Sequence, residues 1–167
     1  LYLKRGDAKK ALTYAELAEK SAVRFNIRLE SGKIYYLKGI ALCALERLDE
    51  GYDFLYRASW CYDYKCAAML HIGLLDIRRR DLARAEAHLS EVLCGNGRSL
   101  LAGAFLGYAK YLGGDRDGAR ACWEKALRED RLNLFAHAFV ALDRGDFQSF
   151  CSLIKTDVTQ VLMDIAE

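Results

Sequence analysis

The chain has 167 residues and a mass of 18.9 kDa, which fits one domain or one array of small repeated units and excludes two large domains. Hydrophobic residues make up 53% and charged residues 29%, and the net charge is +2, so neither nucleic acid nor an anionic membrane is indicated as a partner. The sequence contains no proline, whereas average usage would give about eight. Because proline interrupts helices, its absence favours an all-α chain.

Apolar residues at helical spacing, separated by short turns, predict a series of helix pairs. A partial unit comes first (1–31), and its second helix is expected to run through Phe25. Full units follow at 32–65, 66–99 and 100–130, then a divergent unit at 131–157 and a terminal helix at 158–167. The start, which is not Met and resembles the last turn of a helix, indicates a fragment of a longer protein. Turns with a capping aspartate are expected at Gly6-Asp7, Leu48-Asp49, Arg80-Asp81, Gly114-Asp115 and Gly145-Asp146.

Side chains of fixed size recur with a period of about 34 residues in the middle of the chain. Small residues form three columns: Gly39, Gly73 and Gly107; Gly51, Ala85 and Ala119; Ala58, Val92 and Ala126. Large apolar residues form a fourth column: Leu55, Leu89 and Trp123. A small residue on one helix lets its neighbour approach, and the large residue fills the remaining gap. The period therefore predicts helix pairs stacked in a single array.

These columns resemble the tetratricopeptide repeat (TPR), a helix pair of about 34 residues with aromatic, Leu-Gly, Tyr, Ala, Phe, Ala and Pro positions at fixed offsets. The middle units match it at Tyr35, Gly39, Leu42, Gly51, Leu55 and Ala58; at Met69, Ile72, Gly73, Ala85, Leu89 and Val92; and at Leu106, Gly107, Ala119, Trp123 and Ala126. Departures are the missing proline and the charged Asp76 and Lys110 at usually aromatic positions. The resemblance implies an all-α, right-handed superhelical solenoid of antiparallel helix pairs. A HEAT-like array, whose period is longer, is the structural alternative.

Residues that could carry chemistry are scattered along the chain. Three histidines, at positions 71, 88 and 137, lie in different units without a carboxylate or cysteine at metal-ligand spacing. Six cysteines without a Cys-x-x-Cys pair favour a reducing compartment, the cytoplasm, and only Cys61 and Cys66 are close in sequence. The basic run 78–80 is typical of a solvated helix end. We expect no catalytic activity, no metal and no cofactor, and no apolar run is long enough to span a membrane.

The TPR resemblance also implies where a partner binds, because fixed positions of each first helix line the inner wall of that superhelix. The corresponding groove residues here are Lys33, Tyr36, Ile40, Leu70, Leu74, Arg78, Tyr108, Tyr111, Phe135 and Phe139. This wall is apolar and aromatic and lacks most of the Lys, Asn and Arg residues of the subclass that grips a C-terminal carboxylate. The resemblance implies a protein or peptide partner, bound as a helix or extended apolar segment. Packing of the same side chains on each other, or on another domain of the parent chain, is the alternative.

Two functions follow from these resemblances. The first is a non-catalytic protein–protein interaction scaffold. The second rests on a weaker resemblance to the repeat region of bacterial multidomain proteins with a carbohydrate-associated domain, carried by Ala58-Ser59-Trp60 with Tyr62, Ala67-Ala68, Arg80-Asp81 and Asp130-Arg131-Leu132-Asn133. It implies an accessory helical-repeat domain of a larger bacterial carbohydrate-related enzyme, packed against its catalytic domain.

Overall fold

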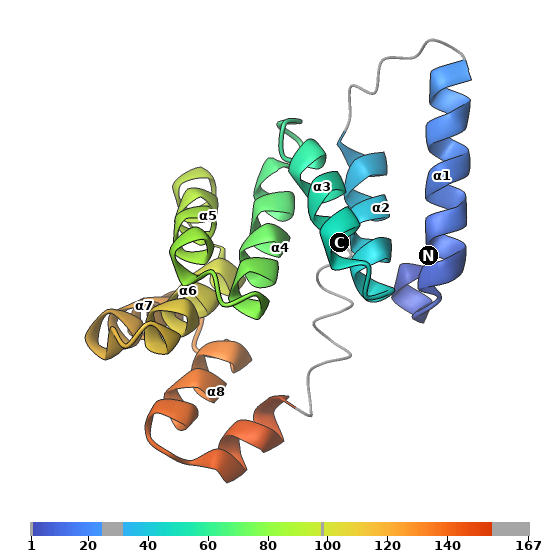
Figure 1. Cartoon of the computed structure of the whole chain (residues 1–167). Helices are drawn as coiled ribbons and strands as arrows, with labels where there is room; N and C mark the ends of the chain where they lie inside the picture. Colours follow the sequence, from blue (N-terminus) through green and yellow to red (C-terminus); the bar gives the residue numbers. More distant parts are fainter. Residues whose placement is uncertain (1, 25–31, 98, 155–167) are drawn as a thin grey trace. The chain divides into compact units, whose positions relative to one another are not determined.

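The computed structural model describes residues 2–24, 32–97 and 99–154, and these residues form helices and turns without any strand (Figure 1). The helices are η1 (Leu3–Arg5), α1 (Ala8–Arg24), α2 (Lys33–Ala44), α3 (Leu48–Ala58), α4 (Lys65–Arg78), α5 (Leu82–Gly95), α6 (Leu100–Leu112), α7 (Arg116–Glu129) and α8 (Leu134–Asp143). Residues 147–154 are also helical. The all-α prediction is confirmed, whereas the extension of the first unit to Phe25 and the terminal helix at 158–167 lie outside the described residues.

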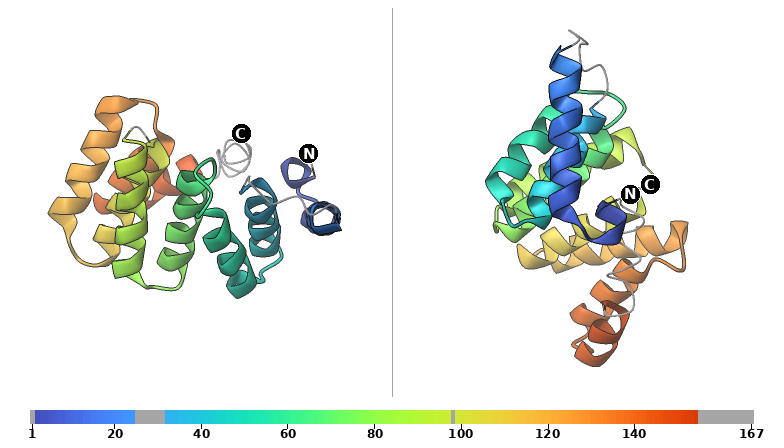
Figure 2. Two further views of the ribbon diagram at one scale, coloured as in Figure 1. Left: turned by 90° about the horizontal axis from the view of Figure 1, so that it is seen from above. Right: turned by 90° about the vertical axis from the view of Figure 1, so that its right-hand side faces the viewer.

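The helices divide between two compact units. The first unit, residues 1–75, contains η1, α1, α2, α3 and most of α4, and α2 packs against both α1 and α3. The second unit, residues 76–167, contains the end of α4 and α5 to α8, and each of α5, α6 and α7 packs against the helix that follows it. Figures 1 and 2 show α2 beside α3 and α6 beside α7 as antiparallel pairs, the arrangement that the repeat predicts.

Every residue of the four repeat columns is buried, as close packing of helix pairs requires. A Cβ atom added to Gly39 of α2 would lie 2.8 Å from Cγ of Leu55 on α3. One added to Gly107 of α6 would lie 2.7 Å from Cδ1 of Trp123 on α7. The Trp123 side chain is 0% exposed, and its indole Nε1–H donates to the Ala104 carbonyl oxygen at 3.0 Å. Glycine is therefore needed at both positions because any side chain would push the two helices apart.

Five turns share one backbone geometry. In each, one residue adopts a positive φ, and the N–H of the next residue donates to the carbonyl five positions before it, near the end of the preceding helix. The residues with positive φ are Gly6, Glu46, Arg80, Gly114 and Gly145. Glu46, Arg80 and Gly114 occupy the same position of three successive repeats, so the turn recurs in the same register as the buried columns.

The residue after the positive φ is the cap of the following helix, and in four turns it is an aspartate as predicted. The Oδ1 atoms of Asp7, Asp81, Asp115 and Asp146 accept the backbone N–H three residues later, at 3.0, 3.3, 2.9 and 3.0 Å respectively. A carboxylate at this position satisfies an otherwise unpaired amide of the first helical turn. Sequence spacing and observed capping agree at these four sites.

The predicted turn at Leu48-Asp49 is wrong, because α3 already begins at Leu48. The residue with positive φ is Glu46, so the cap position falls on Arg47, which provides no side-chain cap. The Arg47 guanidinium instead binds the Glu50 carboxylate, with Nε and Nη2 each 2.7 Å from an oxygen. Asp49 lies in the first turn of α3, where its charge still complements the helix dipole.

Candidate functional site

The predicted groove residues all lie on the first helices of the pairs, α2, α4, α6 and α8, and divide between the two units. The first unit holds Lys33, Tyr36, Ile40, Leu70 and Leu74. The second unit holds Arg78, Tyr108, Tyr111, Phe135 and Phe139. Each set is described within its own unit.

In the first unit, Tyr36 is the buried member of an aromatic cluster. Its side chain is 6% exposed, and its ring centroid lies 5.1 Å from that of Tyr64 and 5.7 Å from the His71 imidazole. Burial raises the pKa of the Tyr36 hydroxyl from 10.0 to about 12, because the ionised form is disfavoured away from water. The remaining members, Ile40, Leu70 and Leu74, are half-buried, and Lys33 is exposed.

In the second unit, aromatic residues of α6 and α8 stack on one another. The rings of Tyr108 and Phe139 are nearly parallel, with centroids 4.6 Å apart, and Phe105 packs against Phe135 at 5.1 Å and against Phe139 at 5.4 Å. Phe139 is 3% exposed and contributes to the core around Trp123. We call Phe105, Tyr108, Phe135 and Phe139 the aromatic ladder. Such offset and edge contacts stabilise ring pairs beyond the area that they bury.

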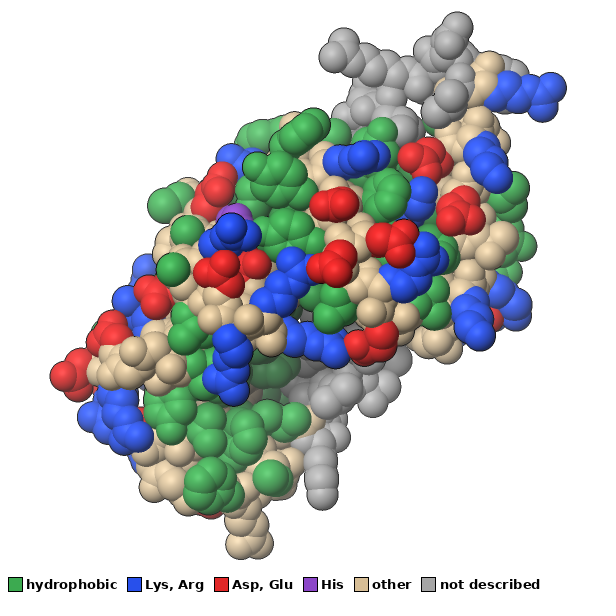
Figure 3. Space-filling model, viewed as in Figure 1, with side chains coloured by type: hydrophobic (Ala, Val, Ile, Leu, Met, Phe, Trp, Pro, Cys, Tyr) green, Lys and Arg blue, Asp and Glu red, His purple; other side chains and the backbone are tan. Residues whose placement is uncertain are grey.

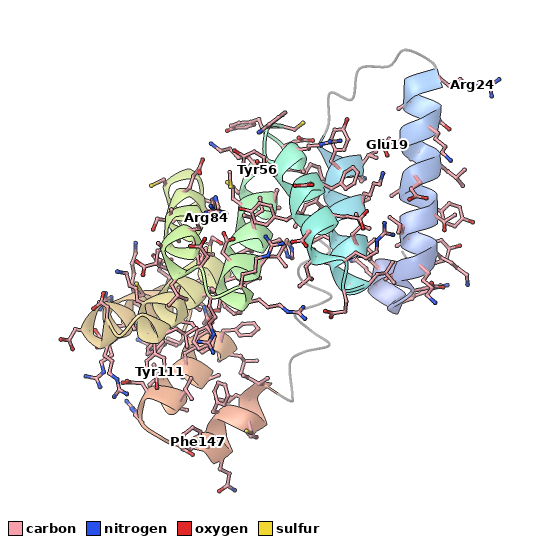
Figure 4. All side chains as sticks on the ribbon, viewed as in Figure 1. Glu19, Arg24, Tyr56, Arg84, Tyr111 and Phe147 are labelled. Atoms are coloured by element: carbon pink, nitrogen blue, oxygen red, sulfur yellow. The ribbon has the colours of Figure 1, made fainter. Side chains whose placement is uncertain are left out.

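Four of the five predicted groove residues of the second unit keep part of their surface accessible. Tyr108, Tyr111 and Phe135 are half-buried, and Arg78 at the end of α4 is exposed. The Arg116 guanidinium lies 5.4 Å from the centroid of the Tyr111 ring. Tyr111 is labelled in Figure 4. The surface view shows hydrophobic side chains gathered in its lower part, where α8 lies (Figure 3). The accessible apolar surface of this unit is thus an extension of its core.

Phe105 is a member of the aromatic ladder that the sequence analysis did not select. It lies on α6, three residues before Tyr108, and contacts both Phe135 and Phe139 of α8. The family positions used for the groove omit it. Helical spacing was the available signal, because residues three apart share one face of a helix.

A buried acid–histidine pair is a second feature that the sequence analysis did not identify. The Asp76 side chain is almost fully buried, and its Oδ2 lies 2.7 Å from Nδ1 of His88 on α5. Burial raises the pKa of the Asp76 carboxyl, and the hydrogen bond and charge of His88 act in the opposite direction. The departure from an aromatic at position 76 was visible in the sequence, but no local spacing linked it to residue 88. The pair fastens the end of α4 to α5.

The described part of the chain contains no metal-binding cluster, no disulfide bond and no helix suited to crossing a membrane. Among residues 2–24, 32–97 and 99–154, no group of three or more His, Cys, Asp and Glu side chains is arranged to hold a metal ion. None of the six cysteines, all of them among the described residues, forms a disulfide with another, Cys61 and Cys66 included. None of the described helices has the length and apolar character that crossing a membrane requires.

Comparison with known proteins gives structural matches only. No family model matches the chain, and no curated protein matches its sequence. A structure of "MamA 41-end from Desulfovibrio magneticus RS-1" matches with a TM-score of 0.68 and 17% identity over 99% of this chain and 89% of the other. A second match, "MamA RS-1 ArsTM double mutant", has the same TM-score and identity and covers 99% and 88% of the two chains. A structure of MamA AMB-1 matches with a TM-score of 0.57 and 20% identity over 88% and 85%. The chain therefore has the fold of MamA, a TPR-like helical solenoid.

Proposed function

We propose that the chain is a non-catalytic scaffold that binds another polypeptide through the apolar side chains of its first helices. The observation that carries the proposal is the aromatic ladder of the second unit, in which three of the four rings, those of Phe105, Tyr108 and Phe135, are only partly buried. The TPR-like fold supports the same interpretation, because stacked helix pairs create extended surfaces suited to long partners. The repeat boundaries at 32–65, 66–99 and 100–130 belong to this proposal. Helices α2 and α3 lie within the first range, α6 and α7 lie within the third, and α4 begins one residue before the second, which supports these boundaries.

The accessible rings have the properties of interface anchors. Tyr108 and Phe135 are held from one side by Phe139 and Phe105, so a partner does not have to immobilise them. Rigid aromatic side chains lose little conformational entropy on binding and bury a large area, which makes them the residues that dominate binding energies. The tyrosine hydroxyl adds a hydrogen-bonding group at the edge of the apolar surface.

This chemistry selects a partner with apolar side chains at regular spacing. An amphipathic helix or an extended apolar segment fits such a surface, and either can come from a separate protein or from another domain of the same parent chain. The alternative function, an accessory domain of a carbohydrate-related enzyme, receives no support from the matched structures. The cytoplasmic location stays a prediction from the cysteine pattern.

The test is a peptide-display selection on the whole chain, followed by calorimetry with the enriched peptides. Tyr108→Glu places a charge on the aromatic ladder and is expected to weaken binding at least about tenfold. Leu132→Glu is the matched control, since Leu132 is 83% exposed in the same unit but lies before α8, and it should bind normally. Circular dichroism of both variants is the check that they are folded. Equal affinity of wild type and Tyr108→Glu for every enriched peptide would refute the proposal.

A further inference from the structure

The end of α3 carries exposed aromatic side chains that the proposed scaffold surface does not use. Trp60 is 75% exposed, Tyr62 is 97% exposed and Tyr56 is 44% exposed. The Tyr56 and Trp60 rings meet edge to face with centroids 5.9 Å apart. The chain's other tryptophan, Trp123, is 0% exposed. Clustered exposed rings on a folded chain are typical of interaction sites.

The segment that carries these rings is rich in acidic residues. Residues 46–63 contain five acidic and two basic residues, in a chain whose net charge is +2. Asp49, Asp53 and Tyr56 follow one another at intervals of four and three residues, so they lie along one side of α3, and Trp60 follows in the turn directly after it. Asp53 is exposed and forms no ion pair with any described residue. A partner that covers the rings therefore meets negative charge beside them.

The two basic residues of this segment are already engaged. Arg47 binds Glu50 through two nitrogens of its guanidinium, and the Arg57 guanidinium lies over the Phe54 ring, 5.3 Å from its centroid. The Lys38 ammonium also lies over the Phe54 ring, 4.1 Å from its centroid. The Phe54 ring of α3 thus already makes cation–π contacts with side chains of the same unit. The exposed rings of Tyr56 and Trp60 can make the same kind of contact with a cation of a partner.

We propose that Asp53, Tyr56, Trp60 and Tyr62 form a docking surface for a positively charged segment of another polypeptide. Arginine or lysine side chains of that segment stack on the faces of Trp60 and Tyr56, and the Asp53 carboxylate supplies the opposite charge. Charge complementarity selects this occupant, because an acidic segment would be repelled and a purely apolar one would leave Asp53 desolvated without a partner. The surface lies on a second helix and shares no residue with the first-helix surface proposed above.

Intrinsic fluorescence of the whole chain provides the test, because Trp60 is exposed whereas Trp123 is buried. The probe is a short peptide of alternating glycine and arginine, titrated at low and high salt. Binding should shift the Trp60 emission to shorter wavelength and protect it from acrylamide, and high salt should weaken the affinity. By calorimetry, Asp53→Lys and Trp60→Ala should each weaken binding about tenfold or more. Phe147→Ala, which removes a ring 65% exposed in the other unit, is the matched control and should bind normally.

Two further peptides test whether an acidic or an uncharged segment binds to the same surface. A glycine–glutamate peptide and a glycine–proline peptide of the same length should leave the Trp60 emission unchanged. The proposal is overturned if either of them binds as tightly as the arginine peptide, or if folded Asp53→Lys and Trp60→Ala bind the arginine peptide as wild type does. It is also overturned if the arginine peptide leaves the Trp60 emission and quenching unchanged. Both positions are exposed, so neither substitution removes core packing.

Discussion

Glu86 and Arg120 occupy equivalent positions of α5 and α7, one repeat apart, and carry opposite charges. Glu86 Oε2 lies 3.5 Å from Nζ of Lys110 on α6, and Arg120 Nε lies 2.7 Å from Oδ2 of Asp143 on α8. A charge pair between consecutive helix pairs is therefore made twice with the charges exchanged, and Asp143 lies one position before the repeat equivalent of Lys110. If each helix packed one repeat away from its observed partner, Glu86 would face Asp143 and Arg120 would face Lys110, which are pairs of like charge. The exchanged charges therefore favour the observed register.

The Arg120–Asp143 pair is expected to matter for stability because the Asp143 side chain is only 7% exposed. Arg120→Glu removes its cation and adds a like charge, and should clearly lower the urea midpoint of unfolding. Combining Arg120→Glu with Asp143→Lys restores an opposite-charge pair and should recover part of the loss. Arg128→Glu is the control, because Arg128 and Glu124 form an exposed pair 3.9 Å apart, and it should change the midpoint little. A single Arg120→Glu variant as stable as wild type would contradict the expectation.

Two of the five turns place a residue other than glycine at positive φ, which costs backbone energy. Arg80 has φ 64°, and Gly114 occupies the equivalent position of the next repeat with φ 90°. Arg80→Gly should raise the free energy of unfolding by about 1 kcal/mol. Gly114→Ala should lower it by about the same amount, and an added Cβ there meets no neighbour within 4 Å, so the effect would be one of backbone strain alone. Denaturant unfolding measures both, and destabilisation by Arg80→Gly would show that its turn is held by side-chain contacts instead.

The uncapped start of α3 suggests a stabilising substitution. Arg47 stands where four other turns have a capping aspartate. Arg47→Asp should supply the missing acceptor and raise the melting temperature, although it removes the exposed contact with Glu50. Asp115→Ala provides the reverse case in α7, where loss of the cap should lower the melting temperature. If Arg47→Asp lowers it, the Arg47–Glu50 contact outweighs a cap at this helix.

Stability should depend on pH through His71. Burial lowers the pKa of the His71 imidazole from 6.5 to about 4, and its Nε2 is buried without a partner among the described residues. The unfolded chain therefore binds more protons than the folded chain between pH 6.5 and about 4. The contribution of neutral His71 to the free energy of unfolding is complete above pH 6.5 and is lost as the pH falls toward 4. The loss amounts to about 3 kcal/mol at most. His71→Phe should flatten this part of the profile, measured as the wild-type minus variant difference in unfolding free energy at pH 7.5, 5.5 and 4.5. A difference that does not change with pH would rule out this role for His71.

The fold was predictable from the sequence because packing of helix pairs constrains side-chain size at fixed intervals. Gly39, Gly107 and Trp123 are informative in this way, since glycine opposite a large side chain, recurring once in each repeat, is what stacked helix pairs demand. The turns were predictable wherever Gly or Asp marked them. The start of α3 was misplaced because Glu46 and Arg47, which carry no turn signal, occupy the turn and cap positions.

The candidate surface was less predictable because a periodic aromatic side chain looks the same in sequence whether it lines a surface or fills a core. Tyr36 and Phe139 were selected as groove residues, yet they are 6% and 3% exposed and pack against other rings. The contact between Asp76 and His88 was also beyond sequence reasoning, because it depends on how two helices approach one another. The exposure of Trp60 and Tyr62 could not be predicted from the sequence either, because it depends on the path of the turn that follows α3.

The fit between Gly107 and Trp123 constrains how this sequence can diverge. The indole occupies the space that any other residue at 107 would need, so neither position can change freely while the other is kept. Among descendants of a common ancestor, these two sites are expected to covary: alanine or a larger residue at 107 should accompany a smaller side chain than tryptophan at 123.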